Sequence, residues 1–125
     1  LDVYKPFKLQ GEQIDGSFKH DGENYTFESK WNDKETACID LYSFAYKIES
    51  NTLYPRGVFF SINGYTDEAL NRITYNKKAQ LVLFDAVDII AVLEERITLK
   101  SLLDEKIRFA QTHSKIYVNA NEILK

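Results

Sequence analysis

Two carboxylates and a lysine stand at a spacing that could support metal-dependent hydrolysis: Asp15, Glu28 and Lys30. The dipeptide Asp21-Gly22 between them is a strong signal for a two-residue hairpin turn, because a type I′ turn needs positive φ at both positions. With that turn, Asp15 lies directly opposite Glu28, and their Cβ atoms are about 5 Å apart. Lys30 points to the same face as Glu28 because side chains alternate along a strand.

A solvent-exposed hairpin face is the simpler interpretation of these polar residues. However, like charges directly opposite each other destabilise a hairpin, so a solvent-exposed face gives no reason to pair Asp15 with Glu28. A hard divalent cation such as Mg²⁺ would turn the repulsion into ligation, since it takes carboxylate oxygens. The ammonium of Lys30 could then activate a water molecule or neutralise charge on a phosphoryl group.

The elements that must position these residues follow the hairpin in alternation. Apolar periodicity, turn signals and helix caps predict helices and short buried strands after it. The predicted elements are a hairpin over 13–31, helices over 40–49, 67 to about 75, 85–95 and 98 to about 112, and strands over 57–62, 80–84 and 115–118. This order predicts an α/β fold with helices packed around a mixed sheet.

Length and composition narrow the class of protein. A chain of 125 residues with 44% hydrophobic residues is one domain with a substantial core. The net charge of −3 disfavours a basic nucleic-acid coat, but it leaves room for an enzyme whose metal supplies positive charge. One cysteine excludes an internal disulfide and fits a reducing, cytoplasmic compartment, and no apolar run approaches the ~20 residues of a membrane span. The absence of Met and the start at Leu1 lead us to expect a piece of a longer protein.

Asp15 followed by Glu28-Ser29-Lys30 on the next strand resembles the signature of the PD-(D/E)xK nuclease superfamily. Longer strings are similar to a restriction-endonuclease-like domain of the Mrr type, and this resemblance covers essentially the whole chain. These strings are GEQIDGSF (11–18), FESKW (27–31), RGVFFSINGYTDEAL (56–70) and LEERITLKSLL (93–103). The chain departs from the superfamily pattern in two ways: Ile14 stands where the proline is usual, and the helix that usually precedes the first catalytic strand is missing.

The resemblance implies a restriction-endonuclease-like α/β/α core with a mixed central sheet and a catalytic antiparallel hairpin, in one domain over 1–125. Asp15, Glu28 and the backbone carbonyl of Ser29 would bind Mg²⁺ or Mn²⁺, and Lys30 would assist the attacking water. The reaction would be endonucleolytic hydrolysis of phosphodiester bonds in nucleic acid, with DNA the expected substrate. The domain would be the effector of a restriction or defence protein, with further domains or a second copy as partners.

Three further residues are candidates for a supporting role. Gln13 faces Lys30 and could hold it or contact a phosphate. Glu12 is either a further metal or water ligand or, as we favour, a surface charge at the start of the first strand. Lys47, on the helix after the Glu28 strand, could meet a phosphate or point to solvent.

Two other classes of function stay open. The chain could be a catalytically inactive nuclease-fold module that binds nucleic acid or another protein. It could also be an oligomerisation domain, with the apolar helices 85–95 and 98–112 as its interface. Neither His20 nor His113 has a second His or a Cys at metal-ligand spacing, so the sequence predicts no zinc site.

Overall fold

The computed structural model describes residues 2–3, 8–10, 13–51, 56–73 and 80–125. For residues 2–3, 8–10, 13–15 and 51 it describes the backbone alone. The predicted role of Glu12 and the side chains of Gln13 and Asp15 therefore lie outside the described part of the chain.

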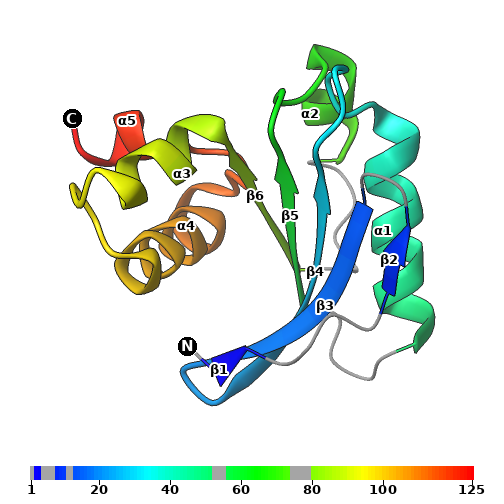
Figure 1. Cartoon of the computed structure of the whole chain (residues 1–125), viewed down its shortest axis with the longest axis horizontal. Coiled ribbons are helices and arrows are strands. Elements are labelled where there is room, and N and C mark those ends of the chain that lie inside the picture. Colours follow the sequence, from blue (N-terminus) through cyan, green and yellow to red (C-terminus); the bar gives the residue numbers. More distant parts are fainter. Residues whose placement is uncertain (1, 4–7, 11–12, 52–55, 74–79) are drawn as a thin grey trace.

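The described residues form six strands and five helices (Figure 1). The strands are β1 (Asp2–Val3), β2 (Lys8–Gln10), β3 (Gln13–His20), β4 (Glu23–Lys30), β5 (Arg56–Ser61) and β6 (Gln80–Asp85). The helices are α1 (Cys38–Asn51), α2 (Asp67–Ile73), α3 (Ala86–Leu93), α4 (Leu99–His113) and α5 (Ala120–Ile123). The predicted order of hairpin, helices and buried strands is confirmed up to residue 113. None of these helices is both long and apolar enough to cross a bilayer.

The strands form one mixed sheet in the order β1-β3-β4-β5-β6, with β2 also paired to β3. The β3–β4 pair is antiparallel, whereas β4, β5 and β6 run parallel to one another. Parallel strands need long crossover connections, which α1 and α2 supply. The chain is therefore a mixed α/β protein, as predicted.

The hairpin has the predicted register. Asp21 and Gly22 adopt φ values of 51° and 79°, the positive values that a type I′ turn requires. Phe18 pairs with Tyr25, and their rings stack with centroids 5.3 Å apart. This apolar pair lies on one face of the hairpin, so the predicted catalytic residues belong to the opposite face.

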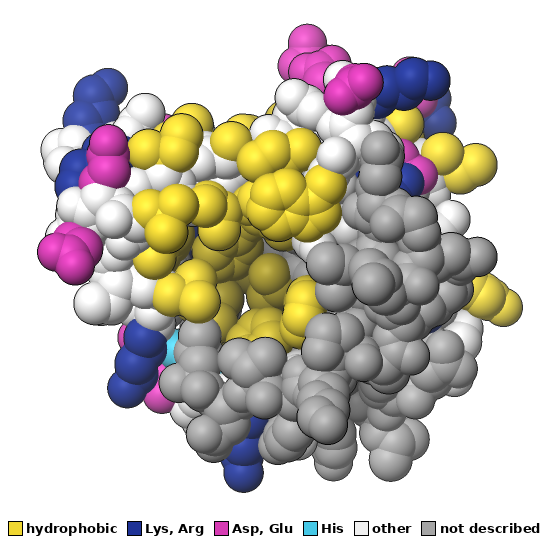
Figure 2. Space-filling view, viewed as in Figure 1, with side chains coloured by type: hydrophobic (Ala, Val, Ile, Leu, Met, Phe, Trp, Pro, Cys, Tyr) yellow, Lys and Arg dark blue, Asp and Glu magenta, His cyan; other side chains and the backbone are white. Residues whose placement is uncertain are grey.

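Helices cover both faces of the sheet (Figure 1). On one face, α1 and α2 pack on β5 and β6 through a core of buried apolar residues that includes Leu41, Phe44, Phe59 and Leu83. On the other face, the core includes residues of β3 to β6 and of α3, α4 and α5. On this second face, an apolar cavity of about 280 Å³ lies between the sheet and helices α3 and α4. Figure 2 shows a hollow there, surrounded by hydrophobic side chains.

Helix α1 approaches β5 closely at Gly57. A Cβ atom at this position would lie 2.7 Å from Cε2 of Phe44 and 2.9 Å from Cδ1 of Ile48. Carbon atoms in proteins essentially never approach so closely, so a larger residue would force Phe44 and Ile48 to shift, and packing favours glycine here. The approach fixes α1 over the sheet, and α1 carries side chains that reach the polar face of β4.

A buried lysine fixes α4 to α3 and to the sheet. The side chains of Lys106 and Asp88 are fully buried, with Nζ and Oδ2 2.9 Å apart. Lys106 Nζ also donates to the carbonyl oxygens of Leu83 and Val118, at 2.7 and 2.6 Å. These three bonds satisfy all three ammonium protons, which is the condition for burying a lysine.

The prediction of an edge strand over 115–118 is wrong. The segment lies along β6, where the amide of Leu83 donates to the carbonyl of Ile116 at 3.0 Å, but it is coil. Nζ of Lys106 donates to a carbonyl of each segment, those of Leu83 and Val118, which favours coil over a continued ladder. The chain then turns into the short helix α5, which the sequence analysis missed.

Candidate active site

The backbone register brings the predicted catalytic positions together at one end of the hairpin. Asp15 is the Cα partner of Glu28, and Gln13 is the Cα partner of Lys30. Both pairings agree with the register predicted from the Asp21-Gly22 turn. The positions of Asp15, Glu28 and Lys30 are thus adjacent in the backbone, on the strand pair that runs into the centre of the sheet.

Glu28 is buried beneath helix α1. Its residue exposure is 5%, and its Oε1 lies 3.5 Å from Nζ of Lys47, which α1 presents to it. Carboxylates are rarely buried unless they are paired, because desolvation penalises the charged form. A solvent-exposed hairpin face is therefore the wrong interpretation for Glu28, and Lys47 is a neighbour of the site rather than a purely solvent-facing residue.

Lys30 is held by an aspartate that the sequence analysis did not single out. Its Nζ donates to Oδ1 of Asp40 at 2.6 Å. Asp40 lies in the first turn of α1, and its other carboxylate oxygen accepts from the backbone amide of Ala37, just before the helix, at 3.1 Å. Asp40 thus orients Lys30 while it stabilises the start of the helix. The sequence offered one signal for this role: Asp40 is an acidic residue in the first turn of the helix that follows the Glu28 strand.

A hydrogen-bonded loop supports the end of β4. Thr36 Oγ1 donates to Ser61 Oγ, which donates to the carbonyl of Gly64, both at 2.7 Å. The amide of Ile62 donates to the carbonyl of Lys30 at 3.1 Å. These bonds fix the segment after Lys30 against the carboxyl end of β5, a place where parallel sheets commonly present functional groups.

Ser29 and Trp31 lie on the opposite face of the same strand end. Ser29 is buried, and its Oγ accepts from Nε1 of Trp31 at 3.2 Å. The Trp31 ring packs on Phe60 with centroids 5.1 Å apart, yet half of its surface is exposed. The Ser29 hydroxyl is thus directed away from Glu28 and Lys30, so the strand offers only the backbone of Ser29 to their face.

No protein-family model matches the chain, and no curated protein or solved structure shows significant similarity to it.

Proposed function

We propose that the chain is a metal-dependent nuclease domain that hydrolyses phosphodiester bonds in nucleic acid. The observation that carries the proposal is the register, in which Asp15 opposes Glu28 while Lys30 follows on the same strand. The burial of Glu28 and the fixed orientation of Lys30 add to it, because preorganised groups are what catalysis requires.

The donor set fits a hard divalent cation, because it consists of oxygen atoms at a buried carboxylate. Asp15, Glu28 and the carbonyl of Ser29 are the residues that would hold Mg²⁺ or Mn²⁺. When bound, such an ion stabilises the charge that develops on the phosphoryl group and favours ionisation of a water molecule.

The lysines of the site have separate tasks. Lys30 uses one of its three N–H donors on Asp40, so it can direct another toward an attacking water or a phosphate oxygen. Lys47, with its Nζ 3.5 Å from Oε1 of Glu28, holds this carboxylate in place. Because the chain carries a net charge of −3, further domains or a second copy would supply the surface that holds a DNA substrate. An effector role in a cytoplasmic restriction or defence protein completes the proposal.

A second candidate is an inactive nuclease-fold module for nucleic-acid or protein binding. The two lysine–carboxylate contacts favour it, because Lys30 with Asp40 and Lys47 with Glu28 balance charge within the chain. Binding of Mg²⁺ or Mn²⁺ by Glu28 separates the two candidates, because an inactive module does not need a metal ion at this site.

Cleavage of plasmid and single-stranded DNA in Mg²⁺ or Mn²⁺ tests the proposal, with Glu28→Gln as the variant and Glu35→Gln, at an exposed position, as its control. Changing a residue outside the ligand sphere of a metal commonly lowers activity 10- to 100-fold. Loss of a ligand should therefore reduce cleavage by more than about 100-fold, while Glu35→Gln cleaves like the wild type.

Calorimetry with Mn²⁺ gives a readout that does not depend on the choice of substrate. The wild type should bind the ion, and Glu28→Gln should bind it at least about tenfold more weakly. A wild-type chain that neither cleaves DNA nor binds Mn²⁺ would contradict the nuclease proposal and favour the inactive module.

A further inference from the structure

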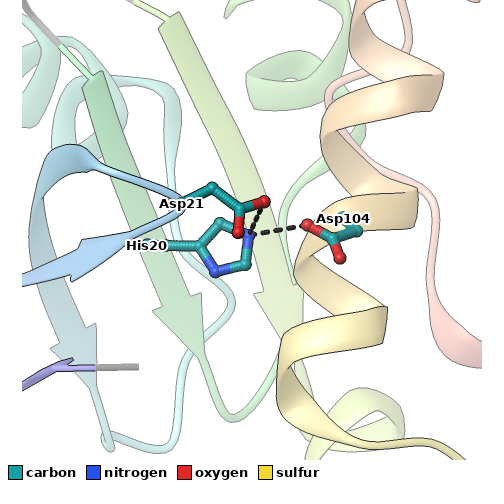
Figure 3. Close-up of side chains that lie close together, drawn as sticks. All are labelled: His20, Asp21 and Asp104. Carbon is teal, nitrogen blue, oxygen red and sulfur yellow. Dashed lines mark hydrogen bonds and ion pairs between the residues drawn. The ribbon is translucent and has the colours of Figure 1, made fainter.

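A second cluster of metal-ligating side chains lies at the far end of the hairpin. His20 ends β3, Asp21 is the first residue of the turn, and Asp104 projects from α4 (Figure 3). Asp104 is 84 residues from His20, so no spacing rule applied to the sequence could have joined them. We propose that these three residues bind a divalent transition-metal ion of the Zn²⁺ class.

The geometry suits such an ion. His20 Nε2 lies 2.7 Å from Oδ1 of Asp104 and 3.5 Å from Oδ2 of Asp21, and one atom from each residue lies within 4.8 Å of the others. Ligand atoms at the usual 2.0–2.1 Å from zinc are about 3.3 Å apart in a tetrahedron. The Asp21 contact has this spacing already, and the Asp104 contact needs to open by about half an ångström. Both aspartates are at least 47% exposed, so their carboxylates can make that adjustment.

The carboxylates of Asp21 and Asp104 approach a single nitrogen atom of His20. Nε2 of a neutral imidazole carries at most one proton, and the short bond directs it to Asp104. The carboxylate of Asp21 approaches the same nitrogen from 3.5 Å. Because a metal ion in place of that proton would engage both carboxylates and Nε2 at once, it would satisfy all three groups.

Charge and space also favour a cation. The cluster contains two carboxylates. Arg56, which lines the same cavity, contacts Glu23 with Nη2 and Oε2 2.6 Å apart. A cavity of about 280 Å³ adjoins the cluster and is lined by its three residues together with Tyr25, Arg56 and Gln111. The cavity has room for the water that completes a three-residue metal site. His20 is only 3% exposed, and its ring packs edge-on against the ring of Tyr25, with the two ring centroids 6.3 Å apart.

Histidine distinguishes this site from the proposed nuclease site. Imidazole nitrogen suits Zn²⁺, Ni²⁺ and Co²⁺, whereas Mg²⁺ prefers oxygen ligands throughout. The ion would join two side chains of the hairpin, His20 and Asp21, to Asp104 of α4, whereas at present the short hydrogen bond links only His20 to Asp104. This inference does not depend on the proposed activity.

Titration of the purified chain with Zn²⁺ alone tests the site, in a Cys38→Ser background that removes the one thiol. We expect a Zn²⁺ site for which excess Mg²⁺ does not compete, and an increase in Tm with Zn²⁺. His20→Gln keeps an N–H that can donate to Asp104 but is a poor ligand, so binding should weaken at least tenfold. His113→Gln, which changes the other histidine of the chain, should bind Zn²⁺ within twofold of the background.

NMR of the histidine rings makes the result independent of how a variant folds. In the Cys38→Ser chain, Zn²⁺ should shift the ring resonances of His20 and leave those of His113 in place. Zn²⁺ binding that leaves the His20 resonances unchanged, or the absence of Zn²⁺ binding up to millimolar concentration, would overturn the proposal.

Discussion

Replacing Lys106 with Met should destabilise the protein more than any surface substitution. The change removes the cation from Asp88, whose side chain is fully buried, and deprives the carbonyls of Leu83 and Val118 of a donor. Removing one partner of a buried ion pair costs about 3–5 kcal/mol, because the other charge stays buried and unpaired. The lost carbonyl bonds add to this cost, and the apolar Met side chain offsets part of it.

We therefore expect a loss of about 4 kcal/mol in the free energy of unfolding, against a total of about 5–15 kcal/mol for a typical domain. For a chain of this length, that loss lowers Tm by about 15 °C. Urea denaturation followed by circular dichroism measures the loss directly. Lys100→Met, at an exposed position on the same helix, is the matched control and should stay within about 0.5 kcal/mol of the wild type.

The pH dependence provides a second check. Burial raises the pKa of Asp88, and the charge of Lys106 lowers it. Without Lys106, this pKa rises further, so the folded variant retains a proton that the unfolded chain releases above the ordinary value of 3.8. Its free energy of unfolding then falls as pH rises, and the deficit relative to the wild type should be smaller at about pH 5 than at about pH 8. A deficit below about 1 kcal/mol at both values would refute the reasoning.

Two further predictions concern packing and alkaline stability. Gly57→Ala should lower the free energy of unfolding by about 1–3 kcal/mol, because the new Cβ would be too close to Phe44 and Ile48. Urea denaturation measures this loss, and a variant as stable as the wild type would mean that these two side chains move aside without cost. Burial, together with the hydrogen bond to Asp85, raises the pKa of Tyr117, and burial raises that of Tyr65 well above its ordinary value. Since a raised pKa stabilises the fold fully below about pH 10 and less as pH rises beyond it, stability should fall by about 1.4 kcal/mol per pH unit for each such tyrosine. In Tyr117→Phe, the free energy of unfolding should fall less steeply above pH 10, by about 1.4 kcal/mol per pH unit. Urea denaturation at several pH values measures this slope, and equal slopes for the variant and the wild type would contradict the assignment.

Local signals in the sequence predicted the elements that depend on local chemistry. The Asp21-Gly22 turn fixes the hairpin register because both residues adopt positive φ. Thr98 caps α4 by accepting from the amide of Ser101 at 3.1 Å, and Thr66 accepts from the amide of Ala69 at 3.0 Å before α2. Each of these signals acts over two to four residues, which is the range that a sequence pattern reports well.

Contacts between distant segments were beyond the reach of the same patterns. The polar face of β4 is typical of a solvent-exposed strand, yet α1 covers it and pairs with Glu28 and Lys30. The segment over 115–118 has the composition of an edge strand, but Lys106 takes one of its carbonyls. In both cases the structure of the segment depends on a side chain of a helix elsewhere in the chain. Which side chain reaches the segment depends on how that helix packs on the sheet.

The coil after α4 has a consequence for the behaviour of the protein at high concentration. β6 is the outermost strand of its side of the sheet, and residues 81–85 are all buried, which makes this segment a strong template for adding a foreign strand. The coil occupies that edge through the carbonyl of Ile116, and Lys106 anchors it from inside the core. Lys106 thus helps to keep the coil along the β6 edge. We expect its loss to leave that edge open to the addition of another strand.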